Sequence, residues 1–110
     1  MRIIVVFNLK EGVNAADYEA WAKKDDIPGV NRLGSVTNFT IHRAKGLFGS
    51  EDAAPYQYVE VLDISSMDPF VADISSEEFQ LMAAPFRDFA DNPQFILTEL
   101  QQVADSPDSS

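Results

Sequence analysis

Polar side chains along two predicted strands are the first candidates for chemistry in this sequence. The stretch 35–43 contains the only histidine of the chain, His42, and the stretch 56–64 contains Glu60. An imidazole titrates near neutral pH and suits general acid–base catalysis. A carboxyl group can do the same work when burial raises its pKa. The sequence therefore predicts proton-transfer chemistry in which His42 is the acid or base, and Glu60 either orients it or serves as the base itself.

Alternation along a strand decides which side chains share a face. The two polar rows are Asn38, Thr40 and His42 on one strand, and Tyr56, Tyr58 and Glu60 on the other. Because a buried polar group needs a hydrogen-bonding partner, such a row inside an apolar strand suggests a function. We predict that both rows line one cleft, where Tyr58 donates a proton or polarises a carbonyl. The alternatives for the histidine row are a dimer interface or solvent, and in either of these His42 would not be catalytic.

The same cleft needs walls that bind a ligand. Tyr18 and Trp21 fall on one face of a predicted helix, together with Ala22 and Asp25. Flat aromatic rings suit a flat heteroaromatic ligand, although plain core packing is the alternative for Trp21. The alternatives for Asp25 are to reach the cleft or to close the helix end at solvent, and we favour the second; we expect Asp26 to cap the turn that follows.

Three further residues are predicted to bind substrate. Asn8 lies at the end of the first strand, and Phe86 lies on the apolar face of a long helix, where core packing is its first role. Phe48 belongs to the loop 44–55, which contains two glycines and is predicted to be either a lid or a contact across a dimer. For Glu60 the alternative role is an interface ion pair with Arg43 or Arg87.

The elements that position these residues follow from periodicity and from turn signals. Strands are expected at 2–9, 35–43, 56–64 and 94–100, helices at 15–25 and 76–90, and a helical turn at 66–72. Pro28 should end the first helix near Ile27, and Pro85 should bend the second. The order β-α-β-β-α-β predicts an α+β, ferredoxin-like fold, with a four-stranded antiparallel sheet and helices on one face.

Both faces of the predicted sheet carry apolar side chains. Ile3 and Val5 lie on one face of the first strand, whereas Ile4 and Val6 lie on the other. Helices cover only one face in this arrangement, and a bare apolar face is an aggregation liability. We therefore predict a homodimer in which two sheets pack face to face.

Composition narrows the function further. The chain has 110 residues, which fits one domain at 1–100 followed by a polar tail at 101–110. It contains no cysteine, which excludes disulfides and thiolate chemistry. The net charge of −10 disfavours nucleic acid and anionic membrane surfaces as partners. With no signal peptide or apolar span recognised, we expect a cytoplasmic protein. A single histidine and scattered carboxylates predict no metal, and no cofactor motif is present.

Five stretches carry a resemblance to a known family. They are VVFNLKEGV (5–13), YEAWAKKDDIP (18–28), LGSVTNFTIHRAKGLFG (33–49), PYQYVEVLDISSMDPF (55–70) and FRDFADNPQFILTE (86–99). The pattern resembles the REDY-like (HapK) family within the dimeric α/β-barrel superfamily. That resemblance implies a homodimer with one cleft per subunit, and cofactor-independent cyclisation with loss of water from a hydrophobic pyrrole- or indole-type intermediate of secondary metabolism. The alternatives are a non-catalytic carrier of such an intermediate and a cofactor-free monooxygenase.

Overall fold

Four antiparallel strands form one sheet, in the order β2-β3-β1-β4. The structure is a computed structural model that describes residues 1–101. The strands are β1 (Arg2–Leu9), β2 (Val36–Arg43), β3 (Tyr58–Ile64) and β4 (Ala90–Thr98). Together with the helices they give the predicted ferredoxin-like α+β fold, which is thereby confirmed.

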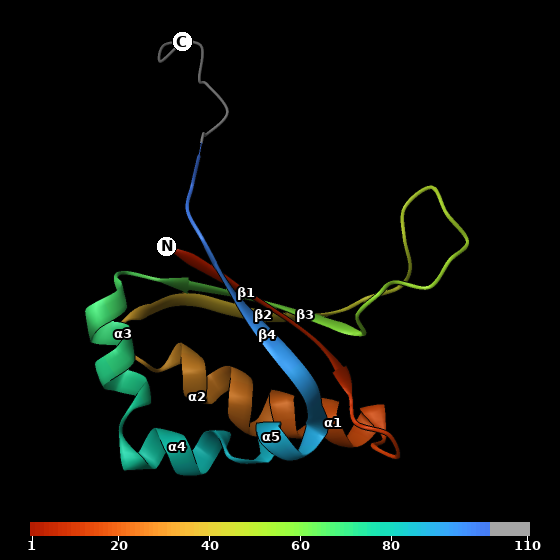
Figure 1. Ribbon diagram of the computed structural model, residues 1–110. Coiled ribbons are helices and arrows are strands. Elements are labelled where there is room, and N and C mark those ends of the chain that lie inside the picture. The colour runs from red at the N-terminus through yellow and green to blue at the C-terminus, as the bar shows by residue number, and fades with distance from the viewer. Residues whose placement is uncertain (102–110) are drawn as a thin grey trace.

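The helices lie together on one side of the sheet (Figure 1). They are α1 (Ala15–Trp21), the π-helix η1 (Ala22–Asp26), α2 (Ile27–Asn31), α3 (Met67–Ile74), α4 (Glu77–Ala83) and α5 (Pro85–Phe89). Asn14 caps α1 through its side chain, which accepts from the backbone N–H of Ala16 at 2.8 Å. Among the described residues, no helix combines the length and apolar character that crossing a membrane requires.

The core lies between this helical layer and the sheet. Alternation is regular on β3, where Tyr58 and Leu62 are buried and Val59 and Val61 on the other face are half-buried. The ring of Phe7 on β1 is fully buried, with its centroid 5.6 Å from those of Tyr18 and Tyr58 and 5.1 Å from that of Phe86. This aromatic cluster joins α1, α5 and the middle strands.

The first helix does not end at Ile27, and that prediction is wrong. The chain continues through η1 into α2, and the N–H of Ile27 bonds to the carbonyl of Ala22 in the π pattern. Pro28 then occupies the first turn of α2, a position that proline tolerates. The helical segment thus continues to Asn31, through the five residues of α2.

The region around Pro85 also differs from the prediction. The single bent helix expected at 76–90 is two helices, with Pro85 opening the second. β4 begins at Ala90, four residues before the strand expected at 94–100. Asn92 adopts a positive φ of 48°, and the pairing of β1 with β4 shifts register between Val6 and Asn8. A bulge on an edge strand accommodates Pro93 because its lack of an N–H breaks no ladder bond there.

Two regions lie apart from the helical layer. The far face of the sheet is covered by no helix in the described part of the chain (Figure 1). Ile4 lies on that face with its register partners Val61 and Ile96. The loop that joins β2 to β3 extends away from the sheet. The predicted tail at 101–110 lies outside the described residues beyond Gln101.

Candidate ligand cavity and its buried carboxyl groups

A cavity of about 420 Å³ lies between the sheet and the helices. That volume is within the ~300–1,000 Å³ typical of small-molecule sites. Apolar side chains from β1, β3 and β4 and from α2 to α5 form most of its wall. The lining residues are Ile3, Val5, Asp26, Val30, Phe39, Glu60, Leu62, Met67, Phe70, Val71, Ile74, Phe79, Gln80, Ala83, Phe86, Arg87, Phe95 and Leu97.

Glu60 contributes a carboxyl group to the buried floor of this cavity. It lies on β3 between Val5 of β1 and Ile41 of β2, and only 5% of it is exposed. The hydroxyl of Tyr18 donates a hydrogen bond to its Oε2 at 3.2 Å. Burial, and secondly the charge of Asp26, raise the pKa of Glu60 to about 8, whereas the bond from Tyr18 opposes this rise. Glu60 is therefore largely a neutral acid at pH 7.

Asp26 contributes a second carboxyl group. It is 6% exposed, and burial raises its pKa to about 7. No described residue donates a hydrogen bond to its side chain, yet no fully buried side-chain oxygen lacks a partner. The carboxyl oxygens of Asp26 must therefore reach the surface of the cavity, which Asp26 lines. The cavity thus holds two carboxyl groups that both titrate near neutrality.

The π-helix explains why Asp26, and not Asp25, is buried. In a regular α-helix the residue seven positions after Tyr18 returns to the same face, which predicts Asp25. The π turn of η1 holds one extra residue. The eighth position, Asp26, then takes the place that Asp25 would have had. The expectation that Asp26 caps a turn is wrong, because its side chain makes no cap hydrogen bond to α2.

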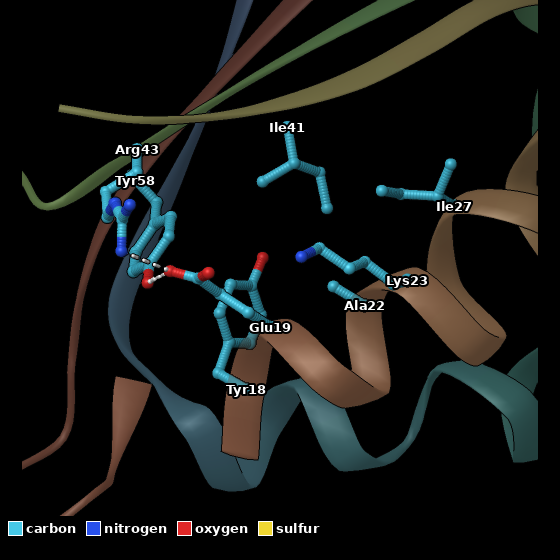
Figure 2. A pocket seen from close by; sticks show the side chains of 8 residues that line it. All are labelled: Tyr18, Glu19, Ala22, Lys23, Ile27, Ile41, Arg43 and Tyr58. Atoms are coloured by element: carbon cyan, nitrogen blue, oxygen red, sulfur yellow. Dashed lines mark hydrogen bonds and ion pairs between the residues drawn. The ribbon is translucent and has the colours of Figure 1, made fainter. Parts of the chain in front are cut away.

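A second, smaller cavity of about 140 Å³ is lined by residues that include Tyr18, Glu19 and Tyr58 (Figure 2). Tyr58 donates to Glu19 Oε2 at 2.5 Å, and Arg43 pairs with the same oxygen at 3.3 Å. Burial, followed by the bond to Glu19, raises the pKa of Tyr58 to about 12. Tyr58 shares a sheet face with Glu60, but its hydroxyl belongs to this smaller cavity.

His42 does not lie near Glu60. It is exposed and pairs in register with Val59, so its side chain points to the face of the sheet away from the helices. Its Nε2 lies 2.9 Å from Oγ1 of Thr40, and exposed Asn38 shares the same face. The predicted grouping of this row with Glu60 in one cleft is wrong. The physical reason is that Phe39 takes the inner face of β2, and alternation then turns His42 outward.

The remaining predicted binding residues divide between the core and the surface. Phe86 lines the large cavity. Trp21 packs its ring against those of Tyr18 and Phe89, at 6.2 and 5.7 Å. Asn8 accepts from the N–H of Gln57 at 2.9 Å and so anchors the end of the loop, away from the cavity lining.

The side chain of Phe48 is fully exposed, at 108%, on the loop that extends away from the sheet. It contacts neither cavity lining. Glu60 forms no ion pair with Arg43 or Arg87 in the described part of the chain, where the two ion pairs are Arg2–Asp63 and Arg43–Glu19.

The residues 1–101 contain no group of three or more His, Asp or Glu side chains placed to hold a metal ion. What the cavity offers instead is a neutral acid and a partly ionised base inside an apolar wall. Such a pair can give a proton to one atom of an apolar molecule and take a proton from another.

The fold and this cavity define a ferredoxin-like α+β protein with a small-molecule-sized cavity between its sheet and its helices. The family model of the REDY-like protein HapK matches residues 1–100, and the chain belongs to that family. The resemblance given by the sequence stretches is thereby confirmed. No curated protein matches the chain.

Solved structures agree with the fold. HapK from Hahella chejuensis superposes with a TM-score of 0.69 at 27% identity, over 96% of this chain and 99% of that one. SnoaB, a cofactor-independent oxygenase from Streptomyces nogalater, gives 0.70 at 14% identity, over 94% and 96%. A dimeric ferredoxin-like protein of unknown function from Thermobifida fusca gives 0.67 at 17% identity, over 86% and 85%.

Proposed function

We propose that the chain is a small-molecule enzyme that cyclises or dehydrates a hydrophobic intermediate of secondary metabolism by general acid–base catalysis, without a cofactor. The observation that carries the proposal is the Glu60 carboxyl group, which lies in an apolar cavity with its pKa raised to about 8. Membership of the REDY-like family supports a pyrrole- or indole-type substrate.

The two carboxyl groups take complementary roles. Glu60, protonated at neutral pH, donates its proton to a departing hydroxyl group, so that the carbon–oxygen bond breaks and water leaves. The ionised fraction of Asp26 removes a proton from the substrate, and the electron pair of that bond closes the ring or forms a double bond. Tyr18 positions Glu60 through its hydrogen bond and keeps one carboxyl oxygen occupied.

Conservative substitutions test this assignment. Glu60→Gln and Asp26→Asn remove the titrating groups with little change in shape, and either should lower the rate of water loss by about 100-fold or more. The measurement is product formation, followed by mass spectrometry, with a panel of hydroxylated pyrrole and indole compounds. His42→Ala is the matched control, because its side chain lies on the opposite face. If both carboxyl variants keep the wild-type rate, the assignment is wrong.

Two other functions give different results in the same experiment. The fold shared with SnoaB, described as a cofactor-independent oxygenase, supports a monooxygenase, and oxygen consumption during turnover would select it. A carrier protein would bind members of the panel tightly and return them unchanged. In that case both carboxyl groups would serve binding alone.

The uncovered face of the sheet supports a homodimer. Ile96 is 45% exposed there, beside half-buried Ile4 and Val61. The Thermobifida fusca protein of the same fold is described as dimeric. Light scattering at micromolar concentration should give a dimer, and Val61→Lys should shift it to monomer because a buried charge is costly. A monomeric wild type would contradict this. A cytoplasmic location remains a prediction.

A further inference from the structure

The two ends of the large cavity differ in charge. Glu60 and Asp26 are buried at one end. The lining residues that are exposed mark the open end, and they are Val71, Gln80, Arg87, Phe95 and Leu97. Arg87 is the one basic residue in this lining. The cavity therefore runs from an acidic floor, through an apolar middle, to a mouth with a single guanidinium group.

The mouth holds Arg87 in place without neutralising it. The Gln80 side chain donates through Nε2 to the carbonyl of Ile74 at 2.6 Å, which turns its Oε1 toward Arg87, and Arg87 donates to that oxygen at 3.4 Å. The two ion pairs within residues 1–101 use Arg2 and Arg43. Arg87 thus presents a positive charge that no described carboxylate neutralises, in a protein with a net charge of −10.

The rim beside Arg87 is apolar. Phe95 and Leu97 on β4 are 60% and 63% exposed, and the ring of Phe95 lies 6.4 Å from that of Phe86. A fully polar ligand would leave these apolar surfaces exposed to water, whereas an amphipathic ligand would cover them and still reach Arg87.

We propose that the ligand is an amphipathic small molecule with one anionic group, which Arg87 binds at the mouth while the apolar body fills the cavity toward Glu60. Charge complementarity fixes the orientation. An anion at the floor would meet Asp26 and Glu60 and lose its hydration, whereas at the mouth it gains a charge-assisted hydrogen bond and keeps contact with water. This inference rests on the proposed function, since it takes the same cavity as the substrate site.

A matched pair of fluorescent probes tests it. 1-Anilinonaphthalene-8-sulfonate and N-phenyl-1-naphthylamine share an apolar body and differ by one sulfonate, and both report binding in an apolar cavity. In Arg87→Gln, the Kd of the sulfonate should rise about five- to tenfold, which is what loss of one such bond gives, and that of the neutral probe less than about twofold. Arg32→Gln removes an exposed arginine outside the lining and should change neither.

A blocking variant shows that the probes occupy this cavity. Ala83→Trp places an indole in the lining and should weaken both probes strongly, with near-ultraviolet circular dichroism as the check of folding. The proposal is overturned if Arg87→Gln changes the two probes equally or changes neither, or if Ala83→Trp leaves both unaffected. Failure of the catalytic proposal is separate. Unchanged turnover in Glu60→Gln would refute it even where Arg87→Gln discriminates between the probes.

Discussion

The two faces of the sheet place their titratable side chains, Glu60 and His42, in opposite environments. On the helix-covered face, Glu60 is 5% exposed, accepts a hydrogen bond from Tyr18 and has a pKa of about 8. On the other face, His42 is exposed and its described hydrogen bond is to its neighbour Thr40. The difference shows that residue type alone does not make a catalytic group. The helical layer turns an ordinary carboxyl group into one that titrates near neutrality, because it removes water from that face.

The largest expected effect is on the pH dependence of the free energy of unfolding, because the two buried carboxyl groups lie on the helix-covered side of the sheet. Glu60 and Asp26 have folded pKa values above their unfolded ones, so the folded state holds protons that the unfolded state has lost. Their contribution is fully present below about pH 4 and is lost as pH rises toward 7 and 8. The expected slope is about 1.4 kcal/mol per pH unit for each group.

Urea unfolding of the wild type between pH 4 and 8 should therefore show a contribution of these two groups to the free energy of unfolding that decreases as pH rises. Glu60→Gln and Asp26→Asn should each flatten the curve, and the double variant should flatten it most. A wild-type curve that rises over this range and stays unchanged in the double variant would contradict the buried neutral carboxyl groups.

Core truncation gives the next largest contrast. Phe7→Ala removes a ring that contacts Tyr18, Tyr58 and Phe86, and should cost about 3–5 kcal/mol at every protein concentration. Ile4→Ala on the uncovered face should cost less, by an amount that depends on protein concentration, since the proposed dimer would cover that residue. Thermal unfolding at two concentrations measures both. If Ile4→Ala shows no concentration dependence, that face is not an interface.

Removal of one hydroxyl group should give a smaller effect. Tyr18→Phe deletes the donor to Glu60 and should destabilise the fold by about 1 kcal/mol. It should also move the pKa of Glu60 further upward, because this bond favours the ionised form. Carboxyl carbon-13 chemical shifts measured against pH report that change, and a downward movement would contradict the assigned role.

The smallest effect is expected at His42. Its side chain is exposed, so His42→Ala should change the free energy of unfolding by less than about 0.5 kcal/mol. Turnover should also stay within about twofold of the wild type. A loss comparable to that of Glu60→Gln would mean that the uncovered face carries chemistry.

Most of the fold was predictable because the strands alternate regularly. Tyr58 and Leu62 fall on one face of β3, and the neighbouring strands pair in the order that β-α-β-β-α-β predicts. Glu60 was recognised as an unusual charge inside such a strand. The boundaries near Pro28 and Pro85 were not predictable, because a proline breaks a helix in one context and opens the next in another.

The site was predicted less well for two physical reasons. Alternation fixes which residues share a face but not which face is inward, so His42 was placed with Glu60. A π turn has no sequence signature of the kind that caps have, so Asp25 was placed on the helix face of Tyr18 and Trp21, where Asp26 lies instead. Arg87 was considered only as an ion-pair partner of Glu60. One long helix was expected at 76–90, whereas α5 and β4 both begin within that range.

The most direct test is a titration of the Glu60 carboxyl group in the ligand-free protein. Carbon-13 labelling of glutamate, with Glu60→Gln to assign the signal, gives its pKa without any substrate. The structure predicts a value of about 8, and a lower one in Asp26→Asn, where the neighbouring charge is gone. A value near the ordinary 4.5 in the wild type would contradict the account, because Glu60 would then be ionised at neutral pH and could not act as the acid.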